Sequence, residues 1–447
     1  MKKKGVRMGK LNKDNLRKTL YYLKKNGLKN TMYAMAERLQ NKDTDSYTYV
    51  PPSEEALKAQ REKLWKTPVT FSILVPVYHT PREYMQELLD SVRAQTYPFF
   101  QLVLLDAGEK QECREVIEKL VNACNDERIQ YYRLSQNVGI AENTNVGLEY
   151  AIGEYIALLD HDDLLTPDAL YEMAKVIEEA RAQDRELVML YSDEDKCDGE
   201  GKHYCEPHFK KDFDRELLFT NNYICHFTAV KTEVFRELKL RGEYNGAQDF
   251  DLVLRVAEKC KENPGAIYHI PKVLYHWRCH DTSTAANPAS KMYAYEAGRR
   301  AVEDCIDKRG WKARVEHLKH LGFYRIVYEE DIFAVRPEIG AVGGSILDKH
   351  SKIAGGLQDA QGKVVYEGLR KGFSGYMNRA ALVQEGELLD IRCMKINPAG
   401  EKLVSPYLAD LQGKSEEEIK ETSRKVCMSL RQAGYVLLWD PEWTVKE

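Results

Sequence analysis

The segment from Val69 to Asp163 alternates short apolar runs with amphipathic stretches, and this pattern constrains the fold more than any other feature. Strands are expected over 69–78, 100–106 and 129–134 and from Tyr155, and helices over 81–96, over 112–125 and from Asn137. This alternation predicts an α/β domain with a mostly parallel, doubly wound sheet. Right-handed crossovers then bring the carboxyl ends of the strands to one edge of the sheet.

Polar residues stand at these strand ends. Tyr78 follows the first strand, Asp106 ends the second, and Asp160-His-Asp162-Asp163 follows the run that begins at Tyr155. Ligands of α/β folds bind beyond the carboxyl ends of the strands. Three carboxylates in four residues repel one another unless a cation lies between them. The pattern therefore predicts a divalent metal site that serves a phosphate, and a solvated acidic turn is the alternative.

Composition narrows the function further. The 447 residues are 43% hydrophobic and 30% charged, which is typical of a globular protein with two or three domains. A net charge of −4 argues against a general nucleic-acid binder. The usual GxGxxG fingerprint does not follow the first strand, which argues against a nicotinamide enzyme. The ten cysteines form no CxxC pair, and no secretory signal precedes them, so reduced cytoplasmic thiols are expected.

Residues 1–66 are expected to form a basic helical arm, broken near Pro51-Pro52. From Met1 to Asn30 there are eleven Lys or Arg and one acid, Asp14. Such a helix can lie on the anionic inner face of the cell membrane. A solvated tail is the alternative. Apolar surface among the lysines comes from Leu20, Tyr21, Leu23 and Leu28.

Three motifs occur together in a specific order, namely Phe71-Ser-Ile-Leu-Val-Pro76-Val-Tyr78, Asn137-Val-Gly139 through Gly147, and Gly153 through Asp163. Over roughly residues 69–286 the chain resembles a bacterial family 2 glycosyltransferase with the GT-A fold, of the surface-polysaccharide or rhamnosyltransferase-like type. The resemblance implies an inverting enzyme that uses Mg²⁺ or Mn²⁺. Such an enzyme moves a sugar from a nucleotide-diphosphate donor to a saccharide or lipid-linked acceptor during surface polysaccharide or cell-wall glycan synthesis.

The resemblance also implies roles for the residues at the strand ends. Asp160 and Asp162 correspond to the pair that binds the metal on the donor diphosphate, and Asp106 corresponds to the acid that contacts the nucleoside. Ala107 departs from the small polar residues that are common at its position. The other donor-site residues implied are Pro76, Tyr78, Asn137 and Gly139.

Two later segments resemble parts of the same enzymes. Tyr191-Ser-Asp193-Glu194-Asp195 is implied to shape the donor-sugar or acceptor pocket, as is Gln248, although the three acids taken alone would suggest a surface loop. Asp249, at the start of an expected helix, corresponds to the general base that deprotonates the acceptor hydroxyl. The alternative for Asp249 is a plain helix-capping carboxylate.

The segment from Ile270 to Ser283 is expected to complete the donor site. Arg278 and Ser283 can contact phosphate oxygens, with Arg278 giving charge-assisted hydrogen bonds. The resemblance makes His280 a candidate third metal ligand, and a structural histidine is the alternative.

Three domains are expected, over 1–66, 67–330 and 331–447, and the last resembles a degenerate, partial second transferase module. Aligning Leu430-Arg431 with Leu254-Arg255 places Lys425 where Asp249 stands, so the copy would lack the base. An unrelated α+β appendage is the alternative.

A homodimer or a complex with other polysaccharide-assembly proteins is left open. The competing functions are a nucleotidyltransferase and a sugar- or nucleotide-binding scaffold.

Overall fold

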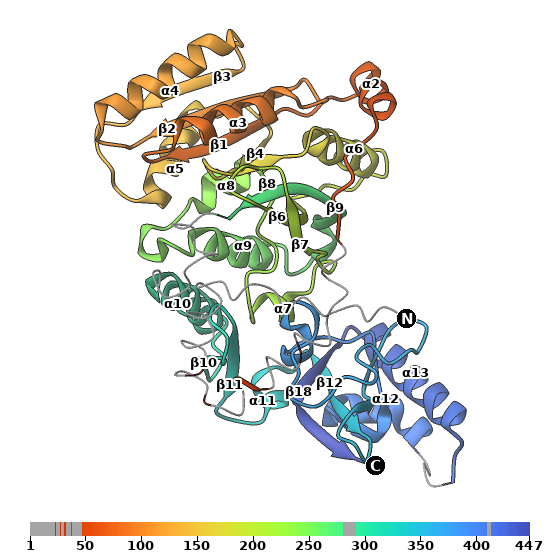
Figure 1. Cartoon of the computed structure of the whole chain (residues 1–447). Helices are drawn as coiled ribbons and strands as arrows, with labels where there is room; N and C mark the ends of the chain where they lie inside the picture. The colour runs from red at the N-terminus through yellow and green to blue at the C-terminus, as the bar shows by residue number, and fades with distance from the viewer. Residues whose placement is uncertain are drawn as a thin grey trace, which may run out of the picture.

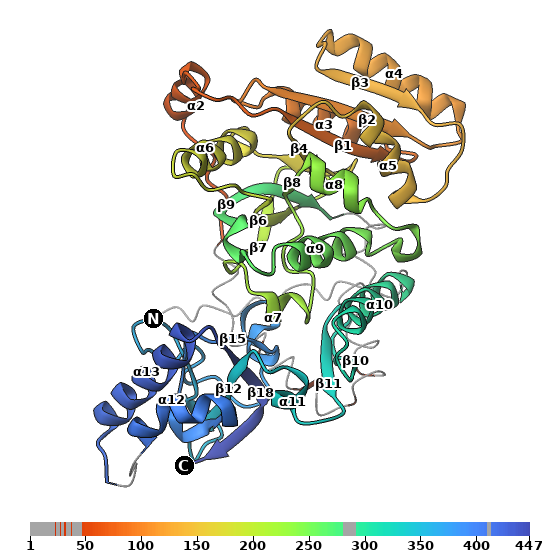
Figure 2. The same cartoon turned by 180° about the vertical axis from the view of Figure 1, so that it is seen from behind.

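A computed structural model describes residues 47–279, 292–408 and 413–447, together with Leu23, Gly27, Thr31, Met32 and Glu37. A larger α/β unit contains the main sheet, and a smaller C-terminal unit packs at one end of it (Figures 1 and 2). The expected sites at His280 and Ser283, and most of the basic arm, lie outside the described residues. In the described part of the chain, no helix is long and apolar enough to cross a membrane.

The main sheet has nine strands in the order β3-β2-β1-β4-β8-β6-β9-β5, with β7 paired to β6. Strands β1, β2, β3, β4, β6 and β9 run in one direction, and β5, β7 and β8 run against them. The prediction of a mostly parallel sheet is confirmed. The strands are β1 (Phe71–Val77), β2 (Phe100–Asp106), β3 (Ile129–Arg133), β4 (Tyr155–Leu158), β5 (Leu164–Leu165), β6 (Met189–Cys197), β7 (Tyr204–His208), β8 (Thr228–Lys231) and β9 (Ile267–Arg278).

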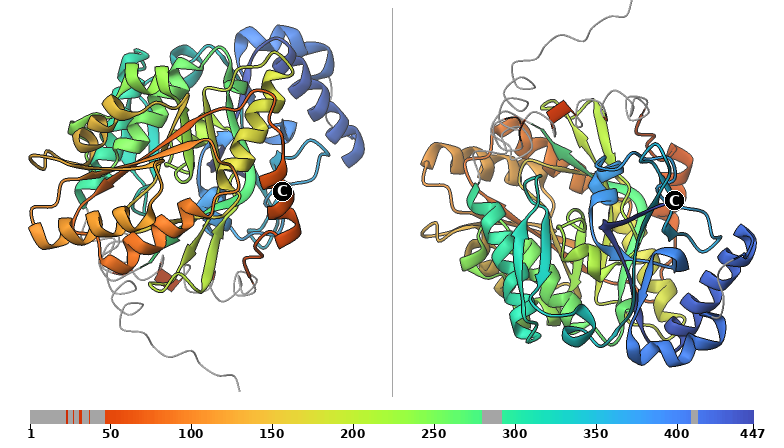
Figure 3. Two further views of the ribbon diagram at one scale, coloured as in Figure 1. Left: turned by 90° about the horizontal axis from the view of Figure 1, so that it is seen from above. Right: turned by 90° about the horizontal axis from the view of Figure 1, so that it is seen from below.

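Helices cover both faces of this sheet, as the view along the long axis shows (Figure 3). Successive side chains of a strand point to opposite faces, so Ile73 and Val75 of β1 enter one core and Leu74 enters the other. The first core is covered by α3 (Arg82–Arg93), α4 (Gln111–Cys124) and α6 (Ala169–Arg181). The second is covered by α5 (Ile140–Tyr150), α7 (Arg215–Leu218), α8 (Thr232–Leu238), α9 (Gln248–Lys259) and α10 (Met292–Lys308).

The segment that precedes β1 lies along the sheet domain. Ser53 caps α2 (Glu54–Glu62), and its hydroxyl accepts a hydrogen bond from the Ala56 N–H. Before this helix, the Tyr47 hydroxyl donates to Asp195 at 2.7 Å. After it, Trp65 packs edge-on against Tyr97, with ring centroids 4.8 Å apart. This part of the expected arm is thus fixed to the sheet domain.

The C-terminal unit has its own sheet, in the order β13-β12-β18-β15 with β17 paired to β12. Arg336 joins it to the larger unit through two hydrogen bonds to Glu216, both 2.7 Å long and buried. Strands β12 and β18 are parallel, and α13 precedes β18 as α9 precedes β9. The hairpin of β10 (Ala313–His317) and β11 (Tyr324–Tyr328) belongs to the larger unit, because Val315 and Tyr324 lie in its second core. The elements of the C-terminal unit are α11 (Ile332–Val335), β12 (Ile339–Leu347), β13 (Ile353–Gly355), β14 (Leu357–Gln358), β15 (Gln384–Glu385), β16 (Leu388–Leu389), β17 (Met394–Ile396), α12 (Pro398–Leu408), α13 (Glu416–Gln432) and β18 (Val436–Lys446).

Candidate active site

The acidic turn between β4 and β5 holds three carboxylates in different surroundings. The side chains of Asp160 and Asp162 keep 48% and 21% of their surface exposed, whereas Asp163 is 1% exposed. The Asp163 carboxylate accepts hydrogen bonds from the Tyr275 hydroxyl and, at 2.7 Å, from the Arg278 N–H. Burial, followed by the charges of Asp162 and Asp160, raises the pKa of Asp163 well above its usual value. Asp163 therefore fixes the turn to the protein interior, and the turn differs in this respect from a solvated acidic loop.

Asp160 lies at the edge of the sheet beside other charged groups. Desolvation by the surrounding protein raises the pKa of Asp160, as does the Asp162 charge, whereas His226 lowers it. The His226 Nε2 is 3.9 Å from Asp160 Oδ2. Carboxylate oxygens are preferred ligands of hard cations such as Mg²⁺ and Mn²⁺. A cation bound by Asp160 and Asp162 would also relieve the repulsion between the two carboxylates. The described residues contain no cluster of three ligating side chains, so donor phosphates and water would supply the other ligands.

Asp249 lies in the first turn of α9, half-buried. Its Oδ2 accepts a hydrogen bond of 2.8 Å from Asn222 Nδ2, and its charge contributes to the raised pKa of Asp160. Ala247 occupies the N-cap position of α9, so Asp249 is not the capping residue that the simpler interpretation required. The neighbouring Gln248 side chain accepts from the Gly246 N–H at 2.7 Å and stabilises the local turn.

The residues expected at the nucleoside lie at the ends of β1 and β2. Asp106 is 1% exposed, and its carboxylate accepts hydrogen bonds from the Tyr131 hydroxyl at 2.6 Å and the Gly108 N–H at 2.8 Å. Pro76 is half-buried in β1, and Tyr78 follows it with 46% exposure. The Asp106 carboxylate therefore already shapes the loop at this edge, and its contact with a nucleoside stays a prediction.

The turn before α5 depends on Gly139. This residue has φ of +97°, and a Cβ there would stand 2.5 Å from the Asn245 Nδ2. The Asn137 Oδ1 accepts from the Gly139 N–H at 3.1 Å and from Asn143 Nδ2 at 2.9 Å. Asn137 and Gly139 thus build the N-terminal end of α5. The Asn245 side chain links this end to the segment before α9 by accepting a hydrogen bond of 3.0 Å from the Ala141 N–H.

Asp193–Asp195 lie in the buried strand β6, so the surface-loop alternative is wrong, and a role in the sugar pocket stays a prediction. Asp193 Oδ1 lies 2.9 Å from His269 Nε2, and Asp195 Oδ1 lies 2.6 Å from His276 Nδ1. Glu194 lies between Lys210, at 3.3 Å, and His226 Nδ1, also at 3.3 Å. These pairings satisfy buried charges, and of the three acids Glu194 is linked to Asp160 through His226.

Arg278 is 0% exposed, and protein groups surround its guanidinium. Its Nε donates to the Asp162 carbonyl oxygen at 2.6 Å, and its Nη1 donates to the Gly199 carbonyl oxygen at 2.9 Å. Its Nη2 forms an ion pair with Glu87 at 2.6 Å. Through these contacts Arg278 holds the acidic turn in place from its buried side. A direct contact of Arg278 with phosphate stays a prediction.

Comparison with known proteins identifies the part of the larger unit that precedes α9. Residues 72–239 match the family described as glycosyl transferase family 2. The chain contains a family 2 glycosyltransferase domain. This finding confirms the resemblance drawn from the strand-end motifs.

Relatives of this glycosyltransferase domain differ greatly in length. Protein y4gI of Sinorhizobium fredii is 40% identical over 244 residues, which is 54% of this chain and 26% of the relative. The O-antigen biosynthesis protein RfbC of Myxococcus xanthus is 31% identical over 246 residues, or 55% of this chain and 18% of the relative. S. aureus TarS 1–349, solved in complex with UDP, is 21% identical, with a TM-score of 0.38 over 53% of this chain and 65% of that one. The chain therefore matches only part of the two sequence relatives.

Two residues of the candidate site, Asn222 and His226, were not predicted from the sequence. His226 bridges Glu194 and Asp160, and its ring stacks on Tyr275 with centroids 4.7 Å apart. Asn222 holds the carboxylate of Asp249. A lone histidine or asparagine in a loop carries no local signal of this kind, because its partners are distant in sequence.

Proposed function

We propose that the chain is a metal-dependent, inverting glycosyltransferase that moves a sugar from a nucleotide-diphosphate donor to a saccharide or lipid-linked acceptor. The observation that carries the proposal is that one segment contacts both groups, since His226 Nε2 lies 3.9 Å from Asp160 Oδ2 and Asn222 Nδ2 donates to Asp249 Oδ2 at 2.8 Å. A setting in surface polysaccharide synthesis is supported by the name of the Myxococcus relative.

Asp249 acts as the general base in this proposal. Its carboxylate removes the proton from the acceptor hydroxyl as that oxygen attacks the anomeric carbon. Asn222 fixes the carboxylate by donating to Oδ2, which leaves Oδ1 for the acceptor. A single displacement inverts the anomeric centre, so no covalent nucleophile is required.

Asp160 and Asp162 would hold Mg²⁺ or Mn²⁺. When bound, this ion neutralises the negative charge that develops on the departing nucleoside diphosphate. Asp163 and Arg278 keep the two carboxylates at the edge of the sheet, since both hold the turn through buried hydrogen bonds.

The base is tested by Asp249→Asn. We expect transfer to fall by about 10²–10⁴-fold, because general-base catalysis contributes that much. Donor binding and melting temperature should change little, because asparagine keeps the acceptor oxygen for Asn222. Asp184→Asn, on an exposed turn, is the matched control. The assignment fails if Asp249→Asn retains full transfer to an acceptor.

The metal site is tested by thermal stabilisation with a panel of nucleotide sugars and Mn²⁺, because a ligand that binds the native state raises its melting temperature. We expect Asp160→Ala to abolish the Mn²⁺-dependent part of the shift. An unchanged shift would contradict the assignment. A turnover assay separates the alternatives. A scaffold would bind a nucleotide sugar without releasing nucleoside diphosphate, and a nucleotidyltransferase would release pyrophosphate only when supplied with a nucleoside triphosphate and a sugar phosphate.

The C-terminal unit is proposed to be the later half of a second, inactive transferase module. The parallel pair β12 and β18, with α13 before β18, repeats the arrangement of β6, α9 and β9. Lys425, the counterpart of Asp249, lies in the middle of α13 and not in its first turn. In this proposal the unit packs on the catalytic domain and has no base of its own.

A further inference from the structure

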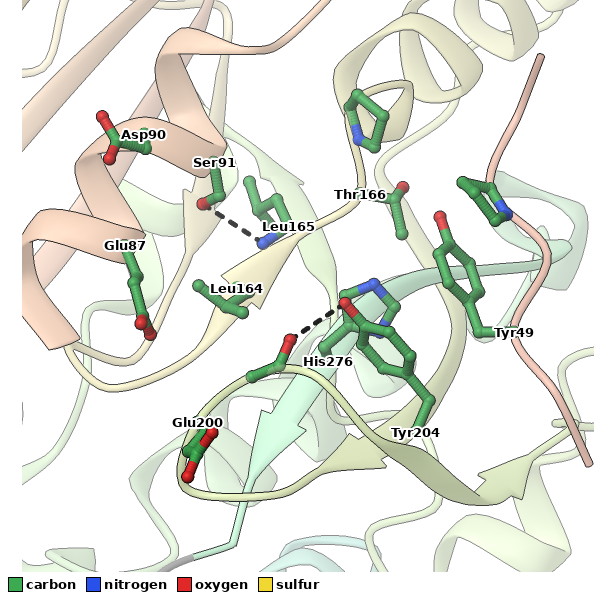
Figure 4. Close-up of a pocket in the computed structure, with 13 residues that line it drawn as sticks. Tyr49, Glu87, Asp90, Ser91, Leu164, Leu165, Thr166, Glu200, Tyr204 and His276 are labelled. Atoms are coloured by element: carbon green, nitrogen blue, oxygen red, sulfur yellow. Dashed lines mark hydrogen bonds between the residues drawn. The ribbon is translucent and has the colours of Figure 1, made fainter. Parts of the chain in front are cut away.

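A pocket of about 490 Å³ lies beside α3 (Figure 4), and Asp249 is not among the residues that line it. Its walls come from the segment before α2, from α3, from β5 and the residues after it, from the β6–β7 turn, and from β7 and β9. This volume falls in the range of small-ligand sites. None of the roles assigned above uses the pocket.

An aromatic wall closes one side of the pocket. The rings of Tyr49 and Tyr204 lie against the imidazole of His276, with centroid distances of 4.6 and 4.3 Å, and 5.1 Å from each other. Two leucines and two prolines extend this apolar surface. Because the three rings pack against one another, they present a continuous surface and do not enclose a cage for an organic cation.

The polar groups of the pocket are mainly hydrogen-bond acceptors. His276 is 3% exposed, and its Nδ1 lies 2.6 Å from Asp195, whose carboxylate can only accept, so the proton stands on Nδ1. Among the residues that the structure describes, none forms a hydrogen bond with His276 Nε2, so this ring atom is left for a ligand hydroxyl. The carboxylates of Glu87, Asp90 and Glu200 add further acceptors.

The chemistry of the residues that line the pocket favours one class of ligand. No Lys or Arg lines the pocket, so its wall offers no cation to a diphosphate and a nucleotide-sugar donor is disfavoured. A sugar ring has hydroxyl donors around its rim and an apolar face that packs on aromatic rings. We propose that the pocket binds one sugar unit of a neutral glycan, away from the reacting hydroxyl. The proposal rests on the proposed function in so far as this glycan is the acceptor or the product.

The pocket shares a wall with the acidic turn. Leu164 and Leu165 line it and directly follow Asp163. Glu87 forms the ion pair with Arg278, whose Nε donates to the Asp162 carbonyl oxygen. A glycan held here therefore contacts the elements that support Asp160 and Asp162. Transfer to long acceptors should consequently be favoured over transfer to short ones.

The experiment measures binding of neutral hexasaccharides of glucose, N-acetylglucosamine and rhamnose to the full chain by saturation-transfer NMR and calorimetry, with choline as the cationic probe. We expect at least one hexasaccharide to bind. Tyr204→Ala should weaken that binding about tenfold through lost ring contact. The double variant Asp90→Asn with Glu200→Gln should weaken it about fivefold and does not depend on the packing of Tyr204. Glu83→Gln, an exposed acid on α3 outside the pocket, should bind as the parent does.

Three outcomes would overturn the proposal. These are binding of none of the hexasaccharides, binding that both pocket variants leave unchanged, and displacement of the glycan by choline. The Mn²⁺-dependent stabilisation by a nucleotide sugar is measured on the same variants and should not change. Loss of glycan binding with intact donor stabilisation identifies the pocket, whereas absence of donor stabilisation in the parent chain contradicts the proposed function and leaves the binding result valid.

Discussion

The three carboxylates of the acidic turn show how neighbouring residues of one type acquire different roles. Asp160 and Asp162 keep exposed surface, whereas Asp163 is enclosed and bonded to Tyr275 and to the Arg278 backbone. The sequence pattern alone gives no reason to assign different roles to the three carboxylates. Their surroundings separate two candidate ligands from one anchor, because burial without a cation is tolerated only where hydrogen-bond donors are supplied.

Asp163→Ala should therefore destabilise the fold. The change leaves the Tyr275 hydroxyl and the Arg278 N–H buried without an acceptor, which costs about 2–3 kcal/mol. Urea unfolding measures the loss. The matched variant Asp162→Ala should unfold nearly as the parent does but lose stabilisation by Mn²⁺ and donor. If the two variants exchanged these behaviours, the division of roles within the turn would be wrong.

At the scale of secondary-structure elements, β4 is positioned by a close contact between the backbone at its start and the backbone of β1. Gly153 precedes β4, and its N–H donates to the Ser72 hydroxyl at 2.8 Å. A Cβ at Gly153 would stand 2.5 Å from the Ser72 N and 2.7 Å from the Phe71 carbonyl carbon. These are main-chain atoms of β1 that cannot move without shifting the strand. The position of the acidic turn thus depends on this glycine.

Gly153→Ala should lower the stability by about 2 kcal/mol, because overpacking against backbone atoms forces a shift of β1 or β4. Thermal unfolding of the parent and variant measures it. Gly265→Ala is the control, since the nearest atom to its Cβ would be 3.6 Å away, an ordinary contact. Equal melting temperatures for both variants would show that β4 can be displaced at little cost.

At the scale of the whole molecule, the C-terminal unit packs on α7 through charged groups. The backbone N–H of Glu385 in β15 donates to Asp214, and Lys211 forms an ion pair with Asp214 at 2.6 Å. Burial, followed by the charges of Asp214 and Glu216, raises the pKa of Glu385 to about 8. The contact between the two units is therefore sensitive to pH.

The folded-state pKa of Glu385 is raised, so the stability that its neutral form contributes is complete below pH ~4.5 and is lost as the pH rises through about 8. Glu385→Gln should remove this loss. The variant should exceed the parent by about 1–2 kcal/mol at pH 9 and match it at pH 4 in urea unfolding. Glu387→Gln, exposed in the same turn, should follow the parent at every pH. A variant that loses stability with rising pH as the parent does would contradict this assignment.

The sequence was sufficient to predict the alternation of strands and helices, the sheet edge at which Tyr78, Asp106 and Asp160 lie, and a helix that begins next to Asp249. These features follow from local periodicity and from short motifs. The antiparallel placement of β8 between β4 and β6 was not predictable, since strand order depends on long-range pairing. Only the tertiary structure placed His226 beside Asp160, Asn222 beside Asp249, and Arg278 behind the turn, 116 residues from its partner Asp162. The tertiary structure also placed Asp193–Asp195, which taken alone suggest a surface loop, in a buried strand. Hydrogen bonds between such distant residues depend on packing, and no local pattern of residues specifies packing.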